Sequence, residues 1–162
     1  MNCYVFFAVY KRRRIRWRVA RRMKGLLYRS FVVWLIVVLG RSQLIHVCIA
    51  DNRVTLDQTI TGPRFYDTLA FTLQYPRLAW CFELKTPRPI RTELASSLGP
   101  VRVIRTIVRR LTGGAIESND CVTATAMVLR DAGVPVPHNV ITPCQLWDYL
   151  RSAGHTMIDL QH

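Results

Sequence analysis

The stretch LIHVCIADNRVTLDQ, residues 44–58, alternates apolar and polar side chains on both sides of Asp51-Asn52. Alternation around a pair of residues that tolerate positive φ predicts a β-hairpin. If Asp51 and Asn52 form a two-residue loop, His46 lies directly opposite Asp57. Directly opposed residues have Cβ atoms about 5 Å apart, so a hydrogen bond between imidazole and carboxylate is within reach. Hairpin geometry alone favours a less specific interpretation, an accidental His–Asp pair on the surface.

The two predicted strands, 45–50 and 53–58, have one apolar and one more polar face, because successive side chains of a strand point to opposite sides of a sheet. The apolar face carries Val47, Ile49, Val54 and Leu56, and the other face carries His46, Cys48, Thr55 and Asp57. A slip of one residue would destroy the pairing of His46 with Asp57. The prediction of the pair therefore depends on the register of the hairpin.

A second informative segment, SNDCVTATAMVLRDAG, spans residues 118–133. A residue of its Ser-Asn-Asp run can cap the start of a helix, and Gly133 can end it. Cys121 then falls in the first turn, where unpaired N–H groups and the positive end of the helix dipole stabilise a thiolate and can hold a developing oxyanion. Cysteine is also a common small core residue. Cys144 opens another predicted helix, 145–151, with an equally good cap, so helix position does not choose between the two cysteines.

The remaining predicted elements indicate an α+β fold. Gly62-Pro63 is expected to break the chain, and LAWCFEL at 78–84 is typical of a third strand. A short helix is expected at 92–98 and an amphipathic helix at 101–111. The apolar stripe of the second helix consists of Val101, Ile104, Ile107, Val108 and Leu111, and its arginines, Arg102, Arg105, Arg109 and Arg110, are expected to form a solvated face.

The first fifty residues carry much of the positive charge of the chain. Of the 23 basic residues among 162, 11 precede Asp51, which is the first acidic residue. A helix at 11–29 would place an apolar stripe among arginines, which suits an anionic partner such as a membrane surface or RNA. The simpler alternative is a solvated basic helix packed on the domain by that stripe. The apolar run at 31–39 has nine residues, whereas a helix that spans a membrane needs about 20. We therefore expect no transmembrane span and expect this run to form a buried strand.

Five cysteines are an odd count without tight spacing, which argues against a secreted module held by disulfides. The expected location is the cytoplasm or another reducing compartment. Cys3, Cys48 and Cys81 lie in strand-like runs and are expected to be inert. No CxxC motif or His/Cys ligand cluster stands out in the sequence, so no metal site and no cofactor are expected.

The order of these motifs resembles the circularly permuted branch of the NlpC-type papain-like family, which includes lecithin retinol acyltransferase-like proteins. In this branch the strand with the histidine precedes the helix with the cysteine. The resemblance rests on FVVWLIVVLGRSQLIHVCIADNRVTLDQTITG, on SNDCVTATAMVLRDAGVPVP and on ITPCQLWDYL, which together lie within residues 31–150. The chain departs from the pattern because it lacks the usual Gly-Asp before the first strand and the glycine of the hairpin turn.

The resemblance implies a papain-like fold in which a small antiparallel sheet packs against the helix that carries the nucleophilic cysteine. It implies Cys121 as nucleophile, His46 as general base and Asp57 as the residue that orients His46, with Gln58 as a near rival for the last role.

The expected function is a cysteine hydrolase acting on a peptide or amide bond, or an acyltransferase. The alternative is a basic structural or nucleic-acid-binding protein with a catalytically silent papain-like fold. Residues 1–30 are expected to be a separate Arg-rich segment and residues 31–162 a single domain.

Overall fold

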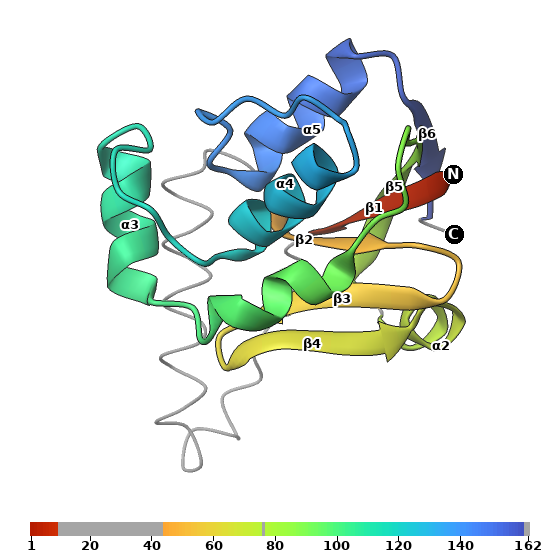
Figure 1. Cartoon of the computed structure of the whole chain (residues 1–162), viewed down its shortest axis with the longest axis horizontal. Helices are drawn as coiled ribbons and strands as arrows, with labels where there is room; N and C mark the ends of the chain where they lie inside the picture. Colours follow the sequence, from red (N-terminus) through yellow and green to blue (C-terminus); the bar gives the residue numbers. More distant parts are fainter. Residues whose placement is uncertain (10–43, 76, 161–162) are drawn as a thin grey trace, which may run out of the picture.

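The computed structural model describes residues 1–9, 44–75 and 77–160. The helix expected at 11–29 and the strand expected at 31–39 lie outside the described residues. The described chain forms one antiparallel sheet with helices on both of its faces, which confirms the α+β class (Figure 1).

The sheet has six strands in the order β4-β3-β2-β1-β5-β6, and every neighbouring pair is antiparallel. Their bounds are β1 Asn2–Val9, β2 Leu44–Ala50, β3 Val54–Thr59, β4 Gly62–Asp67, β5 Leu78–Lys85 and β6 Thr156–Asp159. Strands β2 and β3 were expected from the alternation of their side chains, and β5 was expected at 78–84. Strand β4 corrects the expected break at Gly62-Pro63: Gly62 has φ +123°, a conformation open to glycine, and begins a strand that pairs with β3 along its length.

Strand β1 lies in the middle of the sheet, between β2 and β5. Its alternate side chains, including Val5 and Phe7, are fully buried. The expected boundary at residue 30 therefore does not separate the first residues from the domain, because residues 2–9 supply a central strand. Pairing between segments this far apart in sequence leaves no local signal, so the apolar side chains of residues 2–9 do not reveal the position of β1 in the sheet.

The register of the β2–β3 hairpin differs from the expected one. Ile49 pairs with Leu56 and Ala50 with Thr55, so the loop consists of Asn52 and Arg53 instead of Asp51 and Asn52. The cause is the Asp51 carboxylate, which accepts the backbone N–H groups of Arg53 and Val54 at 2.7 Å each and closes the turn one residue later.

This register shift changes which residues are opposed but leaves the two faces as expected. Each β2 residue now lies opposite a β3 residue two positions away from the expected one, and a shift of two residues preserves the side of the sheet. Cys48 comes level with Asp57, and His46 becomes the diagonal neighbour of Asp57 on the same face. The expected direct opposition of His46 and Asp57 was therefore wrong.

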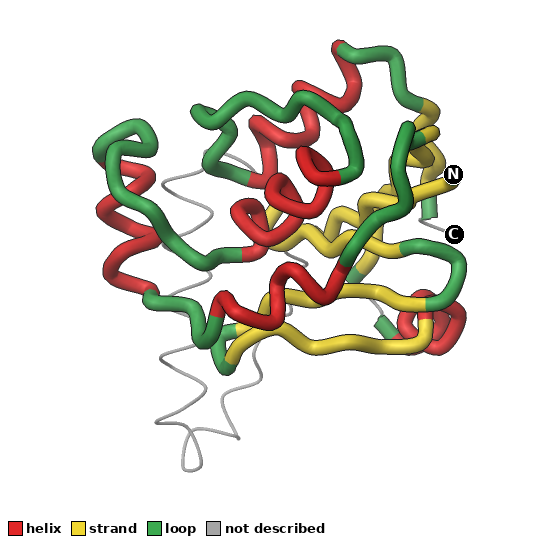
Figure 2. The backbone as a smooth tube through the Cα atoms, viewed as in Figure 1, coloured by secondary structure: helices red, strands yellow, loops and turns green. Residues whose placement is uncertain are grey.

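The helices are α2 Thr68–Gln74, the 3₁₀ helix η2 Thr92–Leu98, α3 Val103–Leu111, α4 Cys121–Asp131 and α5 Pro143–Ser152. Helix α4 begins and ends where its capping residues predicted, and α5 begins at a Thr142 capping box with proline at its start. Helix α2 was not expected. The tube in Figure 2 shows α4 and α5 together on one side of the sheet and α2 on the other.

Each face of the sheet has its own core. On one face Ile49 packs with Val122 of α4 and Leu146 of α5. On the other face Cys48 packs with Phe71 of α2. The face on which the sequence placed Cys48 is therefore buried against α2, and the apolar face is buried against the helix that begins with Cys121.

Helix α3 packs through a different side from the one expected. Ile104 and Leu111 of the expected apolar stripe are 77% and 67% exposed, whereas Arg109 is buried. Arg109 donates a hydrogen bond to Thr123 of α4, and its guanidinium lies 3.9 Å from the Asp120 carboxylate. The ion pair at the start of α4 thus turns Arg109 inward, which corrects the expectation that it belongs to a solvated face.

Candidate active site

Cys121 is the first residue of α4 and is only 9% exposed. The Asp120 carboxylate caps the helix by accepting the backbone N–H of Thr123 at 2.9 Å, and Ser118 donates its hydroxyl hydrogen to the other carboxylate oxygen. The Ala124 N–H donates to the backbone carbonyl of Asp120. The N–H groups of Cys121 and Val122 precede these bonded groups in the first turn, where a helix offers its donors to an anion.

His46 and Asp57 form a close pair between β2 and β3. His46 Nε2 lies 2.6 Å from Asp57 Oδ1, and the two side chains are 18% and 8% exposed. Within the described residues, β2 and β3 pair at Ile49 with Leu56 and at Ala50 with Thr55, and the His46–Asp57 pair lies next to these ladder positions. A hydrogen bond to a carboxylate in such a dry position fixes the orientation and tautomer of the ring.

Cys121 lies close enough to the same imidazole to affect its pKa. Burial lowers the pKa of His46, but the charges of Cys48 and Cys121 raise it, as do side-chain hydrogen bonds to Asp57 and Cys121, and the pKa lies well above its ordinary value. The three residues named by the sequence, Cys121, His46 and Asp57, are therefore brought together from one helix and two strands.

Gln58 is not the partner of His46, although it follows Asp57 directly. Its amide donates hydrogen bonds to the backbone carbonyls of Gly99 and Asn119, at 3.0 and 2.9 Å. The Asn119 side-chain amide in turn donates to the carbonyls of Leu98 and Pro100. Gln58 therefore ties β3 to the residues that precede Cys121, and so holds the tip of α4 beside the strand that carries Asp57.

The other thiols differ from Cys121 in their surroundings. Burial raises the pKa of Cys3 and of Cys81 to about 12, so these strand cysteines remain protonated at neutral pH. Burial also raises the pKa of Cys48 to about 11, against the charge and hydrogen bond of His46. Cys144 lies on α5, where its thiol donates a hydrogen bond to Asp148 at 3.7 Å. Among the cysteines, Cys121 combines a helix start with a contact to His46.

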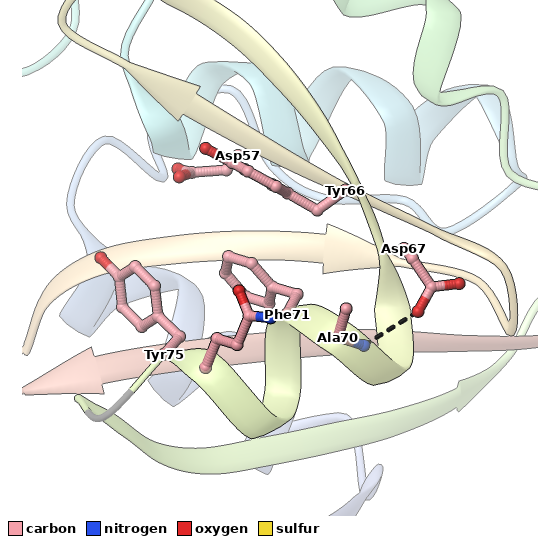
Figure 3. Close-up of a pocket in the computed structure, with 7 residues that line it drawn as sticks. Asp57, Tyr66, Asp67, Ala70, Phe71 and Tyr75 are labelled. Atoms are coloured by element: carbon pink, nitrogen blue, oxygen red, sulfur yellow. Dashed lines mark hydrogen bonds between the residues drawn. The ribbon is translucent and has the colours of Figure 1, made fainter.

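Tyr75, the residue that ends α2, is a neighbour of the site that the sequence did not reveal. Burial raises the pKa of Tyr75, while the charge of His46 lowers it and those of Cys48 and Asp57 raise it. Asp57 and Tyr75 line the same pocket, of about 240 Å³, with Tyr66 and Phe71 (Figure 3). Only the packing of α2 on the sheet brings Tyr75 there, and α2 itself was not expected.

The sequence suggested no cluster of metal-binding residue types, but Cys48 forms one with His46 and Asp57. The donor atoms of His46, Cys48 and Asp57 all lie within 4.8 Å of one another. His46 and Cys48 alternate on one strand, so they share a face, and Asp57 joins them from β3. The His-x-Cys spacing was the sequence signal for this cluster, and it was incomplete without the register of the hairpin.

Comparison of the chain with protein-family models, with curated proteins and with solved structures finds no match. None of the described helices has the length and apolar character required to cross a membrane.

Proposed function

We propose that this protein is a papain-like cysteine hydrolase or acyltransferase that uses Cys121 as nucleophile, His46 as general base and Asp57 as the orienting residue. One observation carries the proposal: a thiol at the start of a helix lies close enough to an imidazole to raise its pKa, and Nε2 of that imidazole lies 2.6 Å from a nearly buried carboxylate. A nucleophile, a base and a third group that orients the base are the elements of a catalytic triad.

The chemistry begins when His46 takes the proton of the Cys121 thiol. The thiolate attacks the acyl carbon of the substrate and forms a carbon–sulfur bond, and the N–H groups at the start of α4 stabilise the charge that develops on the carbonyl oxygen. Protonated His46 then gives its proton to the leaving group, whose bond to the acyl carbon breaks. Asp57 stabilises the imidazolium in between.

The thioester formed on Cys121 is released in a second half-reaction. His46 removes a proton from water or from an acceptor, which attacks the acyl carbon and expels the thiolate. Water as acceptor makes the enzyme a hydrolase, and an alcohol or amine makes it an acyltransferase. The expected substrates contain a peptide or amide bond, and a thioester or lipid ester would be cleaved by the same steps.

The test is selective alkylation with iodoacetamide near neutral pH, read by peptide mass spectrometry. Cys121 should be modified first, and His46→Ala should slow its modification. Cys144 is the matched comparison, because it also lies in the first turn of a helix but on α5. Equal labelling of Cys121 and Cys144, indifferent to His46→Ala, would overturn the proposal.

The composition of residues 11–29 supports a separate proposal, an anionic partner such as nucleic acid or a membrane surface. These residues contain ten of the 23 basic side chains of the chain and no acidic one. Truncation is a poor test, since removal of the first residues would also remove β1 from the middle of the sheet. Replacement of the arginines at 12–14 by glutamine should weaken binding of nucleic acid, measured as a salt-sensitive electrophoretic mobility shift. An unchanged mobility shift would contradict the proposal of an anionic partner.

A further inference from the structure

Cys48 has no part in the proposed reaction, yet it adjoins both residues that serve Cys121. Its side chain is 1% exposed, and its thiol donates a hydrogen bond to Asp57 Oδ1 at 3.7 Å. The imidazole of His46 also bonds to the same thiol. A thiol that lies beside an imidazole and donates to a carboxylate is more than a small core residue requires, because any small apolar side chain would fill that volume.

The three donor atoms are spaced almost as ligands of one ion. Ligand bonds of about 2.0–2.3 Å to a tetrahedral zinc ion place neighbouring ligand atoms about 3.3–3.8 Å apart. The separation of 3.7 Å between Cys48 Sγ and Asp57 Oδ1 already lies in that range. His46 Nε2 and Asp57 Oδ1, at 2.6 Å, would move apart by about 0.7–1.2 Å to admit the ion. All three atoms lie within 4.8 Å of one another.

We infer that His46, Cys48 and Asp57 form a binding site for a thiophilic divalent cation, with Zn²⁺ as the best match. Thiolate, imidazole and carboxylate together are the ligand set of zinc and its neighbours in the first transition series, whereas Mg²⁺ and Ca²⁺ prefer oxygen alone. Three protein ligands leave a fourth position for water or for the Cys121 thiol, which contacts the same imidazole. Coordination displaces the proton of the Cys48 thiol to the solvent.

The backbone and the surroundings support this assignment. His46 and Cys48 stand two residues apart on β2, and Asp57 stands on the adjacent strand, so all three ligands are fixed by the sheet. Asp57 lines the pocket of about 240 Å³ between the sheet and α2, so one of the three ligands borders a cavity (Figure 3). Tyr75 lines that pocket too and lies close enough to interact with the charges of all three ligands.

An ion at this site would compete with the proposed reaction, because both require His46. The ion would take the imidazole nitrogen that Asp57 holds and the carboxylate that orients the ring. Zinc would then inhibit acyl transfer by Cys121. This consequence rests on the proposed function, whereas binding of the ion does not.

The experiment is titration of the full chain with Co²⁺ and Zn²⁺ alone, followed by absorption spectroscopy and calorimetry. Co²⁺ reports thiolate ligation through a charge-transfer band and tetrahedral geometry through its visible spectrum. One equivalent should bind with such a band, and Cys48→Ser should abolish the band and weaken Zn²⁺ binding by at least about 100-fold. Cys81→Ser is the matched control, because Cys81 is a buried strand cysteine in the same core.

No thiolate band in the wild-type protein, or a band that persists in Cys48→Ser, would overturn the site. If Cys48→Ser does not fold by circular dichroism, His46→Gln and Asp57→Asn must each weaken Zn²⁺ binding, and undiminished binding in both overturns the site. Labelling of Cys121 in the presence of a chelator separates the two proposals. A reactive Cys121 without metal binding refutes the ion site alone, and metal binding with an unreactive Cys121 refutes the hydrolase alone.

Discussion

Replacement of Asp57 by asparagine tests the link between the carboxylate and the thiol chemistry. Asparagine has nearly the shape of aspartate but no charge, so the substitution removes the ionic part of the contact at 2.6 Å. A hydrogen bond between charged groups contributes about 1.5–3 kcal/mol, and the low exposure of both side chains limits screening by water. At about 1.4 kcal/mol for each factor of ten, alkylation of Cys121 should slow roughly 10- to 100-fold.

The assay is the second-order rate of iodoacetamide labelling of Cys121, measured with a chelator present so that metal ions do not contribute. Asp67→Asn is the matched control. Asp67 lines the same pocket and carries the same charge, but it caps α2, a role that asparagine also performs. Equal rates in Asp57→Asn, Asp67→Asn and the wild type would refute the role of Asp57. The pKa of His46, followed by NMR titration, should fall in Asp57→Asn and stay unchanged in Asp67→Asn.

Three further predictions concern stability and are measured as free energies of unfolding in urea. The raised pKa of His46 means that its protonated form stabilises the fold below the unfolded pKa of about 6.5, and this stability is lost as pH rises through the folded pKa. The wild type should therefore exceed His46→Gln in free energy of unfolding by less at pH 9 than at pH 6. An equal difference in free energy at both pH values would contradict the raised pKa. Arg109→Met should cost about 3 kcal/mol, because it leaves the buried Asp120 carboxylate without its cation. Arg105 is exposed, so Arg105→Met should change the free energy of unfolding by less than about 0.5 kcal/mol. Similar effects of the two substitutions would refute the buried ion pair. Thr142→Ala should cost about 1 kcal/mol through loss of the capping box of α5, and no change would show that the cap is dispensable.

Local patterns predicted a large share of the fold. Alternation along residues 44–58 predicted two strands and their faces, and these remained correct although the register moved by two residues. The cap before Cys121 and the glycine after α4 predicted the ends of that helix. Such features depend on residues within a few positions of one another, so one sequence suffices to find them.

Long-range packing decided the rest. The apolar residues 2–9 could have taken any position in the sheet, and only tertiary structure placed them between β2 and β5. In α3 the apolar stripe predicted one buried face, but the ion pair of Arg109 with Asp120 selected another. Periodicity ranks the faces of a helix by hydrophobicity and does not include the partner that a charged side chain meets.

The candidate site divides in the same way. The sequence by itself determined that His46 and Asp57 share a face and that Cys121 begins a helix, because side-chain direction follows from strand period and from caps. Tertiary structure alone decided that Cys121 lies close enough to His46 to affect its pKa, that Gln58 holds the residues before α4, and that Cys48 adjoins the His46–Asp57 pair. Contacts of this kind depend on the register of strands and the docking of helices, which are set by the burial of the whole core.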